Sequence, residues 1–206
     1  MLLGETSTLR FVAKPAGLPV FPPHASPAGD CVLTRLLLAC PIQAQSFPPG
    51  FEGGIAHRLD TFTSGFVVVA KNPAALAAVR AEWSSLAKFY RFRSVGTANC
   101  DEQVITAPIA HHPRKKDRVV VGPSGRHRGE WRPAWTRLRR VGDGWWEAEI
   151  HTGALHQVRA HAAYAGLPLD GDSLYGGAPG EPTLVHVGIV GKHWSFWLAD
   201  PPGPPR

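Results

Sequence analysis

Residues 57–73 read HRLDTFTSGFVVVAKNP, a polar segment that runs directly into an apolar one. Residues 65–70 are apolar at every position, which is typical of a strand that is covered on both faces. Asn72 and Pro73 then supply the N-cap and first-turn residues that begin many helices. Asp60 therefore stands just before a buried strand, where burial can shift the pKa of a carboxyl group. The residues alone leave two interpretations of Asp60 open: a turn aspartate that caps backbone amides, and a functional acid.

The remainder of the chain predicts several short strands with two or three helices. We expect most neighbouring strands to be antiparallel, so the predicted fold class is α+β, with a mixed, mostly antiparallel sheet and a few flanking helices. The helix that starts at Pro73 is expected to carry an apolar stripe of Leu76, Val79, Trp83 and Leu86. The other expected elements are strands over 9–13, 89–95 and 193–198, helices over 31–40 and 155–165, a turn over 14–17, and two strands around Gly142-Asp143-Gly144.

Length and composition suit one domain spanning residues 1–206, because 206 residues with 44% hydrophobic content can bury a sizeable core. A basic insertion is expected at about 111–132 and a loose Pro-rich tail at 201–206. The longest apolar run, residues 36–40, is far too short to cross a bilayer, and the first ten residues contain no apolar leader segment. The expected protein is a cytoplasmic monomer without a membrane partner.

Motifs for metals and cofactors are not found in the sequence. The three cysteines are widely spaced and odd in number, so they are expected to be reduced core residues. His151, His156 and His161 are five residues apart, which is about 140° off a common helical face. The chain also has neither a glycine-rich phosphate cradle nor a G-x-S-x-G elbow. We therefore expect no metal, no nucleotide cofactor and no other cofactor.

The net charge of +6 favours a polyanionic partner, and the basic residues are concentrated between residues 111 and 140. The alternative for 111–132 is an ordinary solvated loop with an edge hairpin. The basic residues form three clusters: Arg114, Lys115, Lys116 and Arg118; Arg126, Arg128 and Arg132; Arg137, Arg139 and Arg140.

A second polar segment, TGALHQVRAH, spans residues 152–161. If it is helical, His156 and Arg159 share one face and can aim polar groups at a common pocket. The alternative is a solvated helical face.

Together these segments resemble the RluA-type pseudouridine synthases, whose signature is H-R-L-D-x-x-T-S-G followed by apolar residues and A-K. Further segments match that family in order over about residues 8–200: KPAGL at 14–18, KFY at 88–90, the 152–161 segment, GLP at 166–168 and GDSLYG at 171–176. Ala13, Ala154 and the Val185-His186-Val187 segment depart from the family pattern, and Ala154 replaces an arginine that is expected to affect RNA contacts. The chain resembles the compact members that lack an S4 domain.

The resemblance implies the pseudouridine synthase fold and an isomerase that converts a specific uridine of rRNA or tRNA to pseudouridine after flipping it out of the RNA. It implies that Asp60 acts as the carboxylate, either as nucleophile at C1′ or as base at C2′. Arg159 would pair with Asp60, and Tyr90 would lie against the base. The reaction involves no redox change, which agrees with the missing cofactor motifs.

The same resemblance implies contacts with structured RNA. His57 and Arg58 would brace the gap that the flipped nucleotide leaves, and phosphate contacts would position the substrate. The expected RNA-binding residues are His57, Arg58, Lys88, His156, Gln157, Arg114, Lys115, Lys116 and Arg118.

Two other classes of function compete with the isomerase. One is a non-catalytic RNA-binding module on the same fold, although binding alone has no use for Asp60, Tyr90 and Arg159 together. The other is a cofactor-free hydrolase such as a glycosidase, which usually needs two carboxylates around the bond, whereas only Asp60 stands in a recognisable context.

Overall fold

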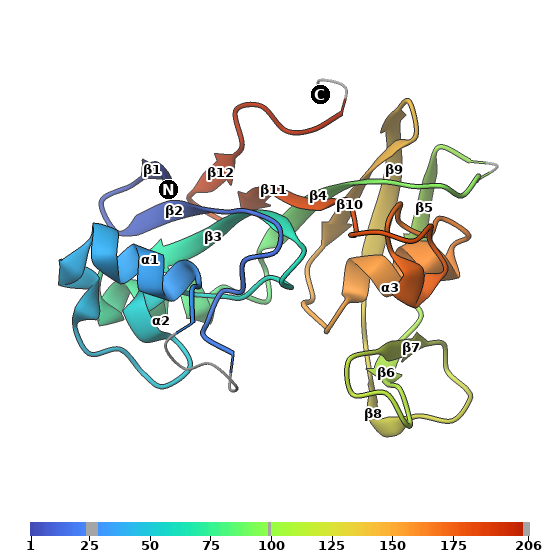
Figure 1. The fold of residues 1–206 in the computed structure, drawn as a ribbon, viewed down its shortest axis with the longest axis horizontal. Helices are drawn as coiled ribbons and strands as arrows, with labels where there is room; N and C mark the ends of the chain where they lie inside the picture. The colour runs from blue at the N-terminus through green and yellow to red at the C-terminus, as the bar shows by residue number, and fades with distance from the viewer. Residues whose placement is uncertain (24–28, 99, 204–206) are drawn as a thin grey trace. The chain divides into compact units, whose positions relative to one another are not determined.

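The computed structural model describes residues 1–23, 29–98 and 100–203 (Figure 1). The chain forms two compact units, and the predicted α+β class, with its mostly antiparallel strands, is confirmed. The N-terminal unit comprises Met1–Leu86 and Gly191–Leu198, and the C-terminal unit comprises Ala87–Val190 and Ala199–Arg206. That all 206 residues act as one catalytic domain stays a prediction.

The N-terminal unit is built on three antiparallel strands in the order β1-β2-β3. They span Leu2–Glu5, Leu9–Lys14 and Ser64–Ala70, and the apolar half of β3 is fully buried, as its sequence predicts. Phe196 of β12 (Ser195–Trp197) stacks on Phe11 with 4.0 Å between ring centroids and meets Phe66 edge-on at 4.8 Å. These aromatic rings pack against β3, the strand that follows Asp60 in the chain.

The helices of this unit are α1 (Val32–Ala39) and α2 (Pro73–Ala81), with 3-10 turns at Pro41–Ala44 and Glu52–Gly54. The predicted start of α2 is confirmed, because the Asn72 side chain accepts a hydrogen bond from Ala75 N at 2.9 Å. The helix ends at Ala81, so the predicted apolar stripe is too long, and Trp83 and Leu86 lie beyond it.

The C-terminal unit contains five antiparallel strands in the order β11-β4-β10-β9-β5. Their bounds are Leu184–Val190, Ala87–Arg93, Trp145–Ile150, Thr136–Gly142 and Glu102–Ile105. The predicted β9–β10 hairpin is confirmed: Asp143 and Gly144 connect the strands with φ of 47° and 77°, the positive values that a tight hairpin turn requires. β5 and β11 were not predicted.

Residues 109–132 fold as a separate three-stranded sheet, which we call the basic arm; that this segment is an insertion stays a prediction. Its strands are β6 (Ile109–His111), β7 (Val119–Val121) and β8 (Arg128–Arg132), in the order β7-β6-β8. The arm lies beyond α3 (Gln157–Tyr164), which a short 3-10 turn at Ser173–Tyr175 follows (Figure 1). Ile109 and Val119 pack with Ala134 and Ala160, so an apolar cluster fixes the base of the arm to α3.

Three further sequence-based expectations can be compared with the structure. Only Cys31 is a core cysteine, since Cys40 is half-buried and Cys100 is exposed. The tail is tied down as far as Pro202, whose carbonyl accepts a hydrogen bond from Arg91 Nη1 at 3.1 Å, whereas residues 204–206 lie outside the described residues. In the part of the chain that the structure describes, no helix combines the length and the apolar character needed to cross a membrane.

Candidate active site

Asp60 lies half-buried in the loop that leads into β3, and Lys14 holds the backbone of this loop. The Asp60 carbonyl accepts a hydrogen bond from Thr63 N at 3.0 Å. Lys14, 1% exposed at the end of β2, donates from Nζ to the carbonyls of Thr61 at 2.8 Å and Thr63 at 2.6 Å. Asp60 therefore lies in a loop that is joined to β3 through the chain and to the end of β2 through the hydrogen bonds of Lys14.

Lys14 also acts on the charge of this loop. Burial lowers the pKa of the Lys14 ammonium to about 8, and the Asp60 carboxylate opposes this by raising it. At neutral pH the Lys14 ammonium is still mostly charged. The sequence showed Lys14 only as part of the KPAGL segment, and its reach to Thr61 and Thr63 is a tertiary contact.

Lys14 gives a prediction about stability and pH. Its pKa in the folded chain, about 8, lies below its ordinary value of 10.5, so the unfolded chain binds more protons between these two values. The free energy of unfolding of the wild type should therefore rise relative to that of Lys14→Met by about 3 kcal/mol as pH increases from 8 to 10.5. Denaturant titrations of both proteins at several pH values measure the difference. If the free energies of unfolding of the two proteins change in parallel with pH, the pKa of Lys14 is not lowered in the folded chain.

His57 and Arg58 differ in their surroundings. The His57 ring accepts a hydrogen bond at Nε2 from Val68 N at 3.0 Å and lies 4.9 Å from the Trp83 ring, which fixes it within the N-terminal unit. Arg58 is exposed. Of the two residues expected to brace a flipped-out nucleotide, Arg58 has the freedom to reach RNA, and both assignments stay predictions.

Lys88 and Tyr90 are two residues apart on β4 and therefore point to the same face of the sheet. The Tyr90 ring is 9% exposed and stacks on His186 of β11 with 4.8 Å between ring centroids. Lys88 is 4% exposed and donates from Nζ to the His151 carbonyl at 2.7 Å. The stack on His186 fixes the Tyr90 ring, and its contact with a base stays a prediction. The burial of Lys88 favours a structural role over the expected RNA contact.

The predicted shared helical face of His156 and Arg159 is wrong in detail, because α3 begins at Gln157 and His156 is its N-cap with a positive φ of 52°. The two side chains nevertheless meet at Tyr175. His156 Nδ1 lies 3.1 Å from the Tyr175 hydroxyl, and the Arg159 guanidinium lies 5.2 Å from the centre of its ring. Burial raises the pKa of Tyr175 to about 12, so its hydroxyl stays protonated.

Arg159 forms a two-pronged ion pair with Asp172. Its Nε and Nη2 donate to the two carboxylate oxygens at 2.7 and 2.8 Å, and Asp172 is 1% exposed. A planar guanidinium held at two points has little rotational freedom. Asp172 was not among the predicted site residues, although it stands in the GDSLYG segment that carries the resemblance. The pairing of Arg159 with Asp60 stays a prediction.

Gln157 and His161 hold the chain around α3. The Gln157 oxygen accepts from Thr152 Oγ1 and Ala154 N, while its nitrogen donates to Trp135 O and Thr136 Oγ1. All four hydrogen-bonding positions of the amide are thus used within the chain, which favours a structural role over the expected RNA contact. His161 is fully buried, its ring nitrogens lie within 2.9 Å of Thr136 Oγ1 and Ala107 O, and burial lowers its pKa.

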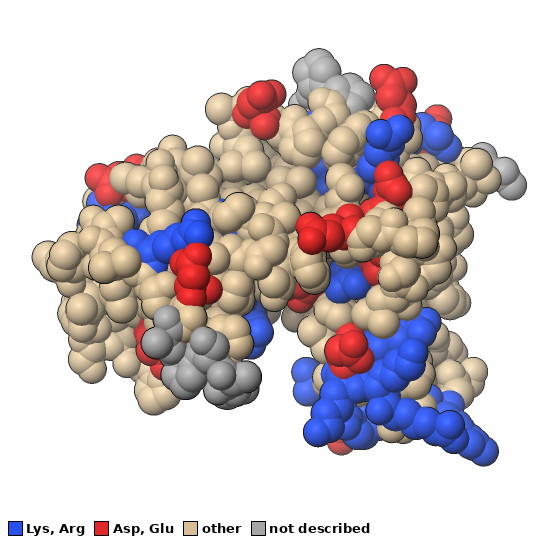
Figure 2. Space-filling model, in the orientation of Figure 1, with Lys and Arg blue, Asp and Glu red and all other residues tan. Residues whose placement is uncertain are grey.

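Most of the basic side chains visible in Figure 2 gather on the arm, and acidic ones are sparse there. Arg114, Lys115 and Lys116 are exposed in the turn between β6 and β7, while Arg118 is half-buried with its guanidinium 5.5 Å from the centre of the Tyr175 ring. A concentrated positive surface of this kind suits a phosphate backbone. Among the residues with described positions, no three or more histidine, cysteine, aspartate or glutamate side chains are grouped for a metal ion.

Solved structures place these two units in a known class of α+β fold. The Human RNA Pseudouridylate Synthase Domain Containing 1 matches with a TM-score of 0.76 and 19% identity over 97% of this chain and 82% of that chain. The Human RNA Pseudouridylate Synthase Domain Containing 4 matches with a TM-score of 0.73 and 20% identity over 98% and 88%. At these identities the likeness defines the fold, which is that of pseudouridine synthases.

The sequence comparisons then give the family. The family model for RNA pseudouridylate synthase matches residues 8–164, and the chain belongs to this family. An uncharacterised RNA pseudouridine synthase of Synechocystis sp. is 33% identical over 93% of this chain and 58% of its own length. The ribosomal large subunit pseudouridine synthase D of Yersinia pestis is 34% identical over 86% and 53%. The chain spans about half the length of the curated relatives it matches, and the predicted RluA-type resemblance is confirmed.

Proposed function

We propose that this chain is an RNA pseudouridine synthase that isomerises a uridine in structured RNA. The observation that carries the proposal is Asp60, which keeps its HRLD setting in a chain of this family and sits on a loop that the buried Lys14 fixes. The ribosomal name of the Yersinia pestis relative makes rRNA the first substrate to test and tRNA the second. A monomer in the cytoplasm stays a prediction.

In the proposed reaction the N1–C1′ bond of uridine breaks, the uracil turns, and C5 joins C1′. C5 then loses its proton and N1 gains one, so uridine and pseudouridine have the same composition. Atoms balance without an oxidant, a reductant or a phosphate donor. Asp60 provides the ionised carboxylate, as nucleophile at C1′ or as base at C2′. Tyr90 lies against the uracil, where its ring stacks and its hydroxyl takes part in proton transfer. Arg159 is the proposed positive partner of the Asp60 carboxylate.

The target uridine must leave its helix before Asp60 can reach C1′, which costs a few kcal/mol. The exposed guanidinium of Arg58 is our candidate for filling the gap. The basic arm would offset the cost by binding phosphates, which also sets the register of the RNA.

The direct test is to map pseudouridine in cellular RNA with and without this protein, and to treat the candidate RNA with the purified chain. We expect one or a few uridines to convert only when the protein is present. An RNA that binds the chain tightly while every uridine remains unchanged would favour the non-catalytic RNA-binding module instead.

The arm gives a prediction about salt. Replacing Arg114, Lys115 and Lys116 with glutamine frees up to three phosphates of the RNA, so the slope of log affinity against log salt should fall by about 0.7 to 0.9 for each phosphate that is no longer neutralised. Affinity should weaken for all RNAs alike, because phosphate contacts do not read sequence. Filter binding or fluorescence anisotropy at four salt concentrations measures the slope. Lys192→Gln, an exposed lysine outside the arm, is the matched control, and an unchanged slope in the triple variant would mean that these side chains are only a solvated surface.

A further inference from the structure

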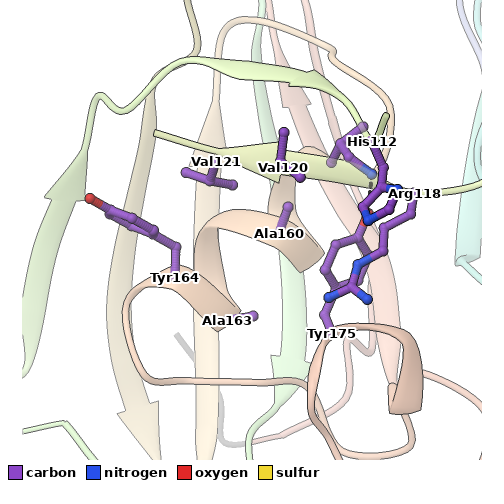
Figure 3. A pocket seen from close by; sticks show the side chains of 9 residues that line it. His112, Arg118, Val120, Val121, Ala160, Ala163, Tyr164 and Tyr175 are labelled. Carbon is purple, nitrogen blue, oxygen red and sulfur yellow. Dashed lines mark hydrogen bonds between the residues drawn. The ribbon is translucent and has the colours of Figure 1, made fainter. Parts of the chain in front are cut away.

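An open pocket of about 370 Å³ lies between the basic arm and α3 (Figure 3). Valines of β7 form one wall, small residues of α3 form another, and two tyrosines stand at opposite ends. The volume falls at the lower end of the range of about 300–1,000 Å³ that is usual for small-molecule sites. The lining residues, all in the C-terminal unit, are His112, Arg118, Val119, Val120, Val121, Ala160, Ala163, Tyr164 and Tyr175.

One end of the pocket is built to receive a negative charge. His112 Nδ1 accepts hydrogen bonds from Arg114 N at 3.2 Å and Lys115 N at 3.0 Å, so its ring hydrogen is on Nε2, which can donate to a ligand. The Arg118 guanidinium lies at the same end, beside Tyr175 (Figure 3). The described residues that line the pocket include no acidic side chain.

The other end is apolar and aromatic. Tyr164 is the last residue of α3 and lines the pocket. It carries a large aromatic ring, yet 58% of its surface is exposed. The side chains of Val121 and Ala163 lie between it and the basic end (Figure 3). An exposed ring next to a small apolar floor is a surface on which a nucleobase can stack, whatever its identity.

The wall at Tyr175 connects the pocket to His156 and Arg159, two of the predicted site residues, within the C-terminal unit. The Tyr175 hydroxyl accepts a hydrogen bond from Val119 N of the arm at 3.0 Å and lies 3.1 Å from His156 Nδ1. The Arg159 guanidinium lies 5.2 Å from the centre of the same ring. A ligand in the pocket would therefore be separated from Arg159 by one side chain.

We propose that this pocket binds one nucleotide of the substrate RNA other than the target uridine. The base lies against Tyr164, and the phosphate is bound by Arg118 and His112. This inference rests on the proposed function only in that the ligand is RNA. It adds a point of recognition beyond the phosphate contacts of the arm, because the pocket takes a base and its phosphate together.

The first test uses adenosine 5′-monophosphate, whose base is not a substrate for isomerisation. NMR titration of the full chain should shift resonances of Ala163 and Tyr164. Tyr164→Ala and Arg118→Gln should each raise the Kd by about fivefold or more, as expected when a stacking ring or a charged hydrogen-bond donor is removed. Val104→Ala and Lys192→Gln, which change exposed residues outside the pocket, are the matched controls and should leave the Kd unchanged.

Three outcomes would overturn the proposal. Inorganic phosphate that binds as tightly as the nucleotide and ignores Tyr164→Ala would mean that no base is bound. Shifts confined to other parts of the chain would place the nucleotide elsewhere. An acidic peptide that matches the nucleotide in affinity, and that only Arg118→Gln weakens, would assign the pocket to a protein partner.

The second test separates this proposal from the proposed function. RNA affinity is measured for the wild type and for Tyr164→Ala, and pseudouridine formation is measured for the wild type. If the wild type isomerises RNA and Tyr164→Ala has unchanged RNA affinity, the pocket proposal is contradicted and the proposed function is supported. If the wild type forms no pseudouridine and Tyr164→Ala weakens RNA binding about fivefold or more, the proposed function is contradicted and the pocket proposal is supported.

Discussion

Asp60→Asn should abolish pseudouridine formation, by at least about a thousandfold, and leave RNA affinity within about tenfold. The substitution keeps the shape of the side chain and removes the negative charge on which both proposed roles of Asp60 depend. The loop should stay in place, because Lys14 donates to the backbone carbonyls of Thr61 and Thr63, which the substitution does not change. Pseudouridine formed per enzyme in a single turnover, with RNA affinity measured alongside, checks both parts.

A second readout shows that the asparagine variant is folded and that only a charge was removed. The Asp60 carboxylate raises the pKa of Lys14, so Asp60→Asn should lower that pKa further below about 8, as NMR titration of the ammonium can show. Asp101→Asn, which removes an exposed acid paired with Arg140, is the control and should isomerise RNA normally. Substantial turnover by Asp60→Asn would defeat the assignment.

Arg159→Lys should slow the single-turnover rate by about a hundredfold while changing RNA affinity much less. Lysine keeps the positive charge but cannot form the two parallel hydrogen bonds that fix Arg159 on Asp172. A mobile ammonium would spend little time in the position that Asp172 gives the guanidinium, which is the position proposed to serve the chemical step. Rapid-quench measurements at saturating RNA, compared with equilibrium binding, separate the two effects.

The same variant also tests the opposite assignment. If Arg159 mainly contacts phosphate, affinity and its salt slope fall and the chemical step stays near the wild-type rate. Asp172→Asn gives an independent check, since it leaves Arg159 itself unchanged and removes the negative charge and one of the two acceptors that hold its guanidinium, so it should also slow the chemical step. Arg139→Lys, in a half-exposed ion pair with Glu147, controls for the general effect of an arginine-to-lysine change.

Local sequence determined the elements whose signals lie within a few residues. The valine run of β3, the cap at Asn72 and the Gly142-Asp143-Gly144 hairpin each carry their own physical cause, and the structure confirms all three. The family also followed from short motifs, because HRLD and GDSLYG keep their order along the chain. The net basic charge and its concentration in residues 111–140 could likewise be read directly.

Tertiary structure decided everything that depends on pairing between distant segments. β11 was missed because Gly188 interrupts its apolar run and weakens the strand signal, and its partner β4 on the sheet fixes it as a strand. α2 ends at Ala81 although the apolar spacing continues. The clamp from Lys14 to Thr61 and Thr63 joins segments 47 and 49 residues apart.

The ion pair of Arg159 with Asp172 and the pocket between β7 and α3 likewise depend on tertiary contacts that the sequence did not predict. Periodicity describes which side of an element is buried but not what covers it, because burial is satisfied by any apolar partner of suitable shape. The sequence therefore indicated the family and the candidate acid, while the folded chain alone decided which groups hold the loop of Asp60 and which side chains share a pocket with the basic arm.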